Sequence, residues 1–139
     1  MIQTIRRGSL EYLAAEGIGV PHAFTTRFGG VSTDYLSSLN LAPSRGDAPE
    51  NVVKNYAILG EALGFDPKNV VLARQVHSDI VYRAEEKDRG AGLFAPGLPD
   101  CDALVTDVPG LALVVFSADC TPVLVWDSVT GAVGAAHAG

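Results

Sequence analysis

The sequence has few cysteines, no long apolar run and no apolar leader. Its 139 residues include two cysteines, Cys101 and Cys120, which are too few for a disulfide framework and are expected as thiols in a reducing compartment. No segment approaches the roughly 18 uninterrupted apolar residues of a membrane helix. Residues 1–7 show no apolar core after their two arginines, unlike a signal peptide. These absences predict a cytoplasmic protein without a membrane partner.

Basic residues are also scarce. Ten basic residues stand against sixteen acidic ones, for a formal net charge of -6, and no basic run occurs. Nucleic acid and anionic membrane surfaces are therefore not expected partners, which favours a small soluble ligand. A hydrophobic fraction of 47% with 19% charged residues is typical of a folded chain. The length and the lack of repeats or linkers predict one domain over residues 1–139.

One helix is clearly indicated after residue 46. Asp47 is a candidate cap, Pro49 suits a first turn, and Glu50 lies three residues after Asp47 as in a capping box. Apolar residues then recur with helical spacing at Val52, Tyr56, Leu59 and Leu63. Gly64 is expected to end the helix. Asn51 and Asn55, two polar residues on this helix, could reach a site, but exposed positions are the favoured expectation.

Several short strands are expected around this helix. They cover residues 22–26, 70–72, 80–82, 103–106 and 111–116, whereas residues 10–15 suit either a strand or a helix. The near-continuous apolar run 111–116 is typical of a central strand covered on both faces. Residues 85–99, rich in charge, glycine and proline, are expected to form an exposed loop that can fold over a site. The class is mixed α and β, within the broad α/β group.

The last twenty residues indicate a β-hairpin that carries a thiol and an imidazole. Apolar segments 123–126 and 132–136 flank the turn-forming stretch 127–131. A turn centred near residues 128 and 129 places Cys120 opposite His137, within about one residue, with Cβ atoms roughly 5 Å apart. Such a pair can share a metal ion or act as nucleophile and base. A buried cysteine beside a core histidine is an equally weighted alternative.

Arg27 stands before the pair Gly29-Gly30, which permits positive φ and close backbone approach. Hydroxyl residues lie nearby at Thr25, Thr26 and Ser32. An arginine in this setting can hold an anion such as phosphate, although a solvated turn residue is the commoner outcome.

Taken together, these segments form an ordered set of motifs. The set comprises Thr25-Thr26-Arg27-Phe28-Gly29-Gly30-Val31-Ser32, Ser38-Leu39-Asn40-Leu41, Gln75-Val76-His77, Ala118-Asp119-Cys120-Thr121-Pro122 and Ala136-His137-Ala138-Gly139. From about Pro21 onward the chain resembles the YfiH or laccase-domain family, whose members carry the labels multicopper polyphenol oxidase, peptidoglycan editing factor and purine nucleoside phosphorylase. The resemblance implies a layered αββα fold and a zinc ion held by His77, Cys120 and His137.

The resemblance also implies an activity. It is phosphorolysis of purine nucleosides, namely adenosine, inosine, guanosine and methylthioadenosine, with deamination of adenosine as a second reaction. Three protein ligands would leave a fourth zinc position open, as in catalytic sites. Arg27 matches the family's arginine and is the candidate for binding phosphate, while Gln75 and Asp119 are candidate polar partners of the substrate or of the ligands. His22 is expected to pack or cap locally.

The chain departs from the family pattern in three places. The family motif continues beyond His-Ala-Gly with Trp-Arg-Gly and a second half of similar length, whereas this sequence stops at Gly139. Asp34 stands where glycine is common, and Asn55-Tyr56 stands where the family has Asn-Arg. We therefore expect the layered fold to be incomplete at its C-terminus and to need the missing half or a second chain.

Other functions compete with this interpretation. Cys120 and His137 could serve a cysteine hydrolase, and a peptidoglycan editing factor is a further alternative. A copper polyphenol oxidase is disfavoured, because blue-copper and trinuclear centres need more histidines than the three present. A cytidine-type deaminase lacks its Pro-Cys-x-x-Cys and His-x-Glu elements. A binding or folding module without catalysis is the remaining alternative.

Overall fold

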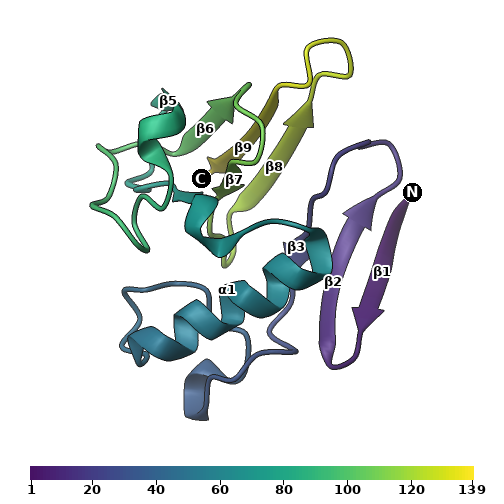
Figure 1. The fold of residues 1–139 in the computed structure, drawn as a ribbon, viewed down its shortest axis with the longest axis vertical. Helices are drawn as coiled ribbons and strands as arrows, with labels where there is room; N and C mark the ends of the chain where they lie inside the picture. Colours follow the sequence, from purple (N-terminus) through teal and green to yellow (C-terminus); the bar gives the residue numbers. More distant parts are fainter. The chain divides into compact units, whose positions relative to one another are not determined.

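The computed structural model describes residues 1–139 and divides them into two compact units, Met1–Pro67 and Lys68–Gly139. One α-helix, three short 3₁₀ helices and nine strands confirm the predicted mixed α and β class (Figure 1). None of the helices has the length and apolar character needed to cross a membrane. Each unit is described below by itself.

The first unit contains a three-stranded antiparallel sheet in the order β1-β2-β3. The strands are β1 (Ile2–Arg7), β2 (Leu10–Ala15) and β3 (Phe24–Thr25). The strand alternative for residues 10–15 is confirmed, whereas β1 was not expected. All but one of the β1 residues are exposed, so this edge strand lacks the apolar alternation by which strands are predicted.

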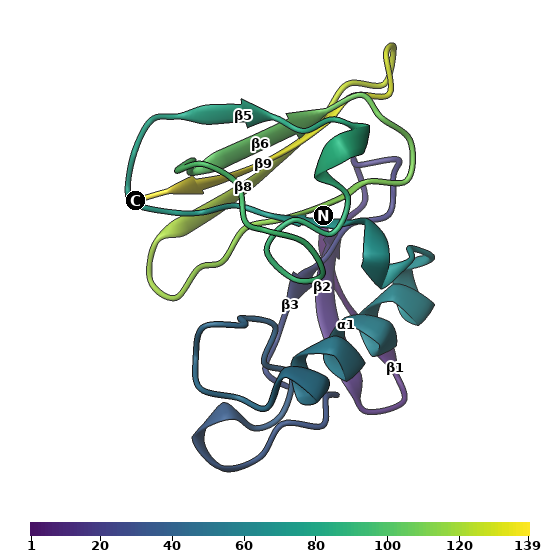
Figure 2. The same ribbon diagram turned by 60° about the vertical axis from the view of Figure 1, so that its left-hand side comes forward.

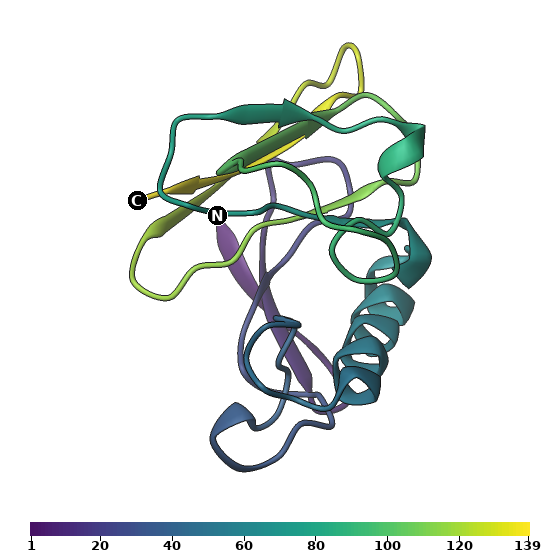
Figure 3. The ribbon, with the colours of Figure 1, turned by 90° about the vertical axis from the view of Figure 1, so that its left-hand side faces the viewer.

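The helix α1 spans Pro49–Leu63 and ends at Gly64, which adopts the left-handed conformation with φ of 82°. The predicted stop is confirmed, but the predicted cap is wrong. Ala48 is the N-cap, and its methyl side chain cannot accept a hydrogen bond. Asp47 lies one residue before the cap, and its carboxylate accepts hydrogen bonds from Ser32 Oγ and from the side-chain amides of two asparagines. An apolar core formed by Leu10, Tyr12, Leu39 and Leu59 joins the helix to β2 and to the loop before the helix. Figure 3 shows the course of the helix and of the strands of this unit.

Asn55 lies on the buried side of α1, with no exposed surface, so the prediction that it is exposed is wrong. Its Oδ1 accepts a hydrogen bond from Val31 N at 2.8 Å, and its Nδ2 donates to Asn40 O at 2.7 Å. The amide thus satisfies backbone groups of the loop that contains the 3₁₀ helix η1 (Asp34–Leu36). A Cβ on Gly30 would come within 2.5 Å of this Oδ1, which confirms the close backbone approach predicted for the glycine pair.

The second unit contains two sheets. Strands β4 (Val70–Leu72) and β7 (Ala112–Val114) form a parallel pair. The larger sheet has the order β5-β6-β9-β8, in which β5 pairs parallel to β6 and the other pairs are antiparallel (Figure 2). Its strands are β5 (Val81–Arg83), β6 (Ala103–Thr106), β8 (Thr121–Trp126) and β9 (Val133–Ala138). Two 3₁₀ helices complete the described elements, η2 (Pro67–Asn69) and η3 (Glu86–Asp88).

Two predictions for this unit are wrong. β7 is not a central strand covered on both faces, because it pairs only with β4 and its three residues are half-buried. The loop 85–99 is not exposed throughout, because its small and apolar residues join the core of the unit. That core consists of Val71, Ala73, Ala84, Ala91, Leu98, Cys101, Leu104 and Leu111.

The predicted β-hairpin is confirmed, but its register differs from the prediction. His137 pairs with Pro122 rather than with Cys120. The loop closes through a hydrogen bond from Asp127 N to Ala132 O, and the Asp127 carboxylate accepts a further bond from Val129 N. The turn is therefore centred one residue later than predicted, which moves the pairing by two residues and places Cys120 just before β8.

Candidate metal and catalytic site

Three side chains of types that can bind a metal ion gather at one end of the larger sheet of the second unit. His77 follows β4, Cys120 precedes β8, and His137 lies in β9. One ligand atom from each lies within 4.8 Å of the others. Cys120 Sγ is 3.8 Å from His77 Nε2, and the two imidazole rings meet edge to face with centroids 4.9 Å apart. Residues predicted as one metal site are thus brought together.

His137 is held by a buried carboxylate. Its Nδ1 lies 2.8 Å from Asp102 Oδ2, and the two residues are 8% and 2% exposed. Because an ionised carboxylate can only accept a hydrogen bond, Nδ1 carries the proton. The lone pair of the neutral ring is then on Nε2, the tautomer required of a metal ligand.

The same carboxylate organises the turn that presents His77. Successive backbone N–H groups of Val76, His77 and Ser78 donate to Asp102 at 2.9, 3.1 and 2.8 Å. His77 itself adopts a left-handed backbone with φ of 61°, a conformation that few residues other than glycine adopt. Burial raises the pKa of the Asp102 carboxyl, but the bonds from Ser78, Val76 and His137 outweigh it and hold the pKa below its usual range.

The donor set fits a metal ion. Tetrahedral zinc with bonds of about 2.0–2.3 Å separates its ligand atoms by roughly 3.5 Å, which is close to the distance between Cys120 and His77. Two imidazoles and one thiolate suit zinc and also copper. A set of three leaves one coordination position for a small molecule.

Gly139 lies against both histidine rings. A Cβ at this position would be 2.6 Å from His77 Cδ2 and 3.4 Å from His137 Cε1. Since carbon atoms in ordinary contact are about 3.5–4.0 Å apart, no larger residue fits here without moving a ring. The close packing restricts where the His77 imidazole can lie.

Gln75 and Asp119 also lie in the second unit. Both amide atoms of Gln75 are bonded to one residue, Nε2 to Phe116 O at 2.8 Å and Oε1 to Phe116 N at 2.6 Å. These bonds tie the segment before His77 to the segment before Cys120. Asp119 is exposed, beside Cys120. Substrate binding by these two residues stays a prediction.

Arg27 belongs to the first unit, where its Nε donates to Ser37 O at 2.8 Å. The terminal guanidinium nitrogens have no protein partner, so they can receive an anion. Two of the three hydroxyl groups named with Arg27 in the sequence are engaged elsewhere: Thr26 Oγ1 donates to Glu11 O, and Ser32 Oγ donates to Asp47. Phosphate binding by Arg27 alone therefore stays a prediction.

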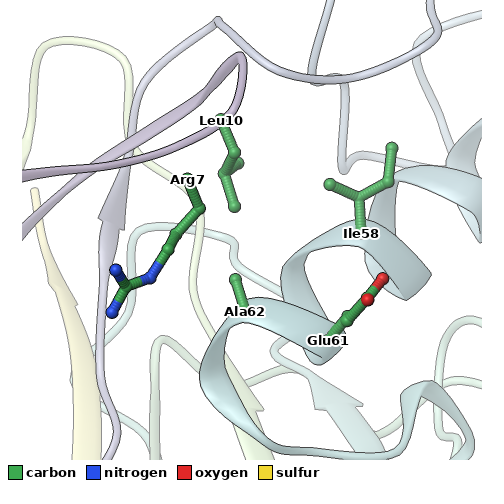
Figure 4. A pocket seen from close by; sticks show the side chains of 5 residues that line it. All are labelled: Arg7, Leu10, Ile58, Glu61 and Ala62. Carbon is green, nitrogen blue, oxygen red and sulfur yellow. The ribbon is translucent and has the colours of Figure 1, made fainter.

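Two further features of the first unit lie outside this set. His22 accepts a hydrogen bond from Ala15 N and lies 2.7 Å from Val20 O through Nδ1, which confirms that it packs locally. A hollow beside α1 is lined by Arg7, Leu10, Ile58, Glu61 and Ala62 (Figure 4). It contains no histidine or cysteine and brings no nucleophile to a possible ligand.

Comparison with known proteins tests the family resemblance. A sequence model of the family described as multi-copper polyphenol oxidoreductase laccase matches residues 21–139. The chain belongs to this family. The match begins at Pro21, where the predicted resemblance also begins, so the laccase-domain resemblance is confirmed.

Relatives in the laccase family include proteins named purine nucleoside phosphorylase and solved structures. The purine nucleoside phosphorylase of Deinococcus radiodurans is 45% identical over 130 residues, which cover 94% of this chain and 47% of the relative. The crystal structure of YlmD from Geobacillus stearothermophilus, 33% identical, has a TM-score of 0.84 and is matched over 98% of this chain and 52% of that one. Bacillus licheniformis YfiH gives 0.81, with 32% identity over 96% and 50% of the two chains. The chain spans about half the length of the relatives that it matches.

Sequence reasoning did not find Asp102. The sequence shows only an aspartate before an apolar strand, a common arrangement at strand ends. Its neighbour relation to His137 depends on the pairing of β6 with β9, in which Ala103 faces Ala136. A prediction of that pairing would have placed the carboxylate beside the imidazole.

Proposed function

We propose that this laccase-family chain supplies the metal site of a zinc-dependent purine nucleoside phosphorylase. The main support is that His77, Cys120 and His137 lie close enough together to bind one metal ion. In addition, relatives of this chain bear the name purine nucleoside phosphorylase. The proposed substrates are phosphate with adenosine, inosine, guanosine or methylthioadenosine. Residues 1–139 would form the N-terminal part of one domain in this enzyme.

In phosphorolysis a phosphate oxygen forms a bond to ribose C1′ while the bond from C1′ to purine N9 breaks. The purine takes the bonding electrons and a proton, and ribose 1-phosphate is the second product. The protein must therefore hold an anion, orient the ribose and manage the proton of the leaving base. Zinc at the three-ligand site supplies Lewis-acid chemistry when it is bound.

The remaining predicted residues have distinct roles in this proposal. Arg27 holds phosphate through its terminal nitrogens, which have no protein partner. Asp119, exposed next to Cys120, accepts hydrogen bonds from the substrate. Gln75 positions the His77 and Cys120 segments through Phe116, and its contacts favour this role over direct binding of substrate.

Deamination of adenosine is proposed as a second reaction of the same site. It consumes water and releases ammonia, and it needs an open position beside the metal ligands. The set of three protein donors leaves such a position. Conversion of adenosine to inosine without phosphate would measure this reaction separately from phosphorolysis.

A cysteine hydrolase is the rival that the structure supports best. Cys120 could act as the nucleophile, His137 as the base, and Asp102 as the carboxylate that orients the base. His137 Nδ1 lies 2.8 Å from Asp102 Oδ2. A thiolate bound to zinc is a poor nucleophile, so metal dependence separates the two functions. Hydrolysis by metal-free protein would favour the rival.

The test measures release of hypoxanthine from inosine by the full chain, with and without phosphate, together with metal content. Cys120→Ser should lose both metal and turnover. Cys101→Ala is the matched control, because Cys101 is a buried core residue and should retain both. Turnover that does not depend on phosphate, or that survives complete removal of metal, would falsify the proposal, and bound copper in place of zinc would contradict the choice of metal.

A further inference from the structure

The Asp102 carboxylate contacts both histidines of the candidate metal site through different groups. Its Oδ2 bonds the side chain of His137 and the backbone N–H of His77. Its Oδ1 bonds Val76 N, Ser78 N and Ser78 Oγ. Five hydrogen bonds thus converge on one side chain that is 2% exposed.

The backbone places this carboxylate accurately. Asp102 O accepts the N–H of His137 at 2.7 Å, and Asp102 N donates to Ile80 O at 3.1 Å. Asp102 is therefore joined on one side to β9 and on the other to the segment that follows His77. Neither the imidazole of His137 nor the backbone of His77 can shift without lengthening a bond to this residue.

We propose that Asp102 is a positioning residue of the metal site, which fixes the tautomer of His137 and the backbone turn of His77 together. This inference rests on the proposed metal site. For His137 the carboxylate keeps the proton on Nδ1 and the lone pair on Nε2. For His77 it gathers three consecutive N–H groups and so stabilises the left-handed backbone that aims the ring at Cys120.

Asp102→Asn tests both effects with little change of shape. The amide can place its oxygen at only one of the two carboxylate positions, so its NH₂ group faces either the His137 ring or backbone N–H donors. Facing His137, it donates to Nδ1 and moves the ring proton to Nε2, which removes the ligand lone pair. If the NH₂ group faces the backbone, two kinds of donor face each other. The hydrogen bonds from residues 76 and 78 are then lost, and the turn that presents His77 is destabilised.

The first measurement uses metal-free wild-type chain labelled with ¹⁵N in its histidines. Long-range ¹H–¹⁵N spectra at about pH 8, above the ordinary histidine pKa, report which ring nitrogen carries the proton. The inference requires the Nδ1–H form for His137. Finding Nε2–H in the wild type overturns it, even if every variant fails to fold.

The second measurement titrates zinc alone into wild type, Asp102→Asn and Asp88→Asn. Asp88 is the matched control, a buried carboxylate of the same unit that bonds Glu85 N and Tyr82 Oη. We expect Asp102→Asn to weaken zinc binding by about 10–100-fold and to change the His137 tautomer, while Asp88→Asn keeps both. Unchanged affinity and tautomer in folded Asp102→Asn, or equal losses in both variants, overturn the inference.

These readouts separate the inference from the proposed function. Zinc binding that depends on Asp102, in a protein without phosphorolysis, refutes only the function. If the protein catalyses phosphorolysis and Asp102→Asn leaves its zinc affinity unchanged, only the positioning role is refuted.

Discussion

Gly139→Ala should weaken metal binding strongly while leaving the fold intact. The new Cβ would lie 2.6 Å from His77 Cδ2 and 3.5 Å from His77 Cγ. Ordinary carbon contacts need about 3.5 Å or more, so the ring must move by roughly 1 Å. Metal ligands tolerate only about 0.2 Å of displacement. His77 would then bind an ion held by Cys120 and His137 only through a lengthened, weaker bond.

The expected loss of zinc affinity is about 100-fold, equivalent to about 2.7 kcal/mol. Stability of the metal-free protein should change by less than about 0.5 kcal/mol, because His77 and Gly139 are both exposed. Zinc titration against a chromophoric chelator measures the affinity, and thermal unfolding measures the stability. Gly17→Ala is the matched control, since a Cβ there has no atom within 4 Å.

A double-mutant cycle sharpens this test. In a His77→Ala background there is no ring to displace, so Gly139→Ala should have no further effect on zinc affinity. A dissociation constant within twofold of wild type for Gly139→Ala, or an equal loss in the His77→Ala background, would refute the reasoning.

Two further predictions concern the first unit. Gly30→Ala should destabilise it by about 3 kcal/mol, because the Cβ would approach within 2.5 Å of the buried Asn55 Oδ1; chemical denaturation measures the loss, and a loss no larger than that of Gly17→Ala would contradict the packing argument. The hydrogen bond from Ser32 is the largest cause that lowers the pKa of Asp47, so the folded pKa lies below the unfolded value of about 3.9. The stabilisation is complete above that value and is lost as pH falls through the folded pKa. The difference in melting temperature between wild type and Asp47→Asn should therefore stay constant above about pH 5 and shrink as the pH falls below about 4. A difference that stays constant down to about pH 2 would exclude this linkage.

The metal-site residues were predictable to different degrees. Cys120 and His137 follow from local sequence, because a short turn at Asp127 brings the ends of two apolar segments together. The predicted partner of His137 was two residues away from the observed one, because the loop between the two strands is longer than its composition indicates. His77 is 43 residues from Cys120, and no local pattern connects them, so only the family resemblance supplied it.

Buried polar residues were the main failure of sequence reasoning. Asn55 was expected in solvent because polar residues on helices are usually exposed, yet it bonds the backbone of a loop that lies far away in sequence. Asp102 has the same character, with donors at residues 76–78 and at His137. In both cases most of the partners are backbone groups whose positions depend on the finished fold, and the sequence does not specify those positions locally.

Strand predictions failed where a segment is paired but exposed, or apolar but largely unpaired. β1 is paired but exposed, so it lacks an apolar pattern. The run 111–116 is apolar, yet only Ala112–Val114 pair, in a two-stranded sheet. Apolar content reports burial, whereas pairing depends on neighbours that are distant in the chain.

The separation of the metal-site residues along the chain links metal supply to folding. His77, Cys120 and His137 meet only after β4, β8 and β9 have assembled, and an unfolded chain would have to close long loops to gather them. An ion that binds the assembled site alone adds about 2.7 kcal/mol to stability when its free concentration is 100 times the dissociation constant. The second unit of the same protein would therefore resist heat and proteolysis more strongly in metal-replete medium than under chelation.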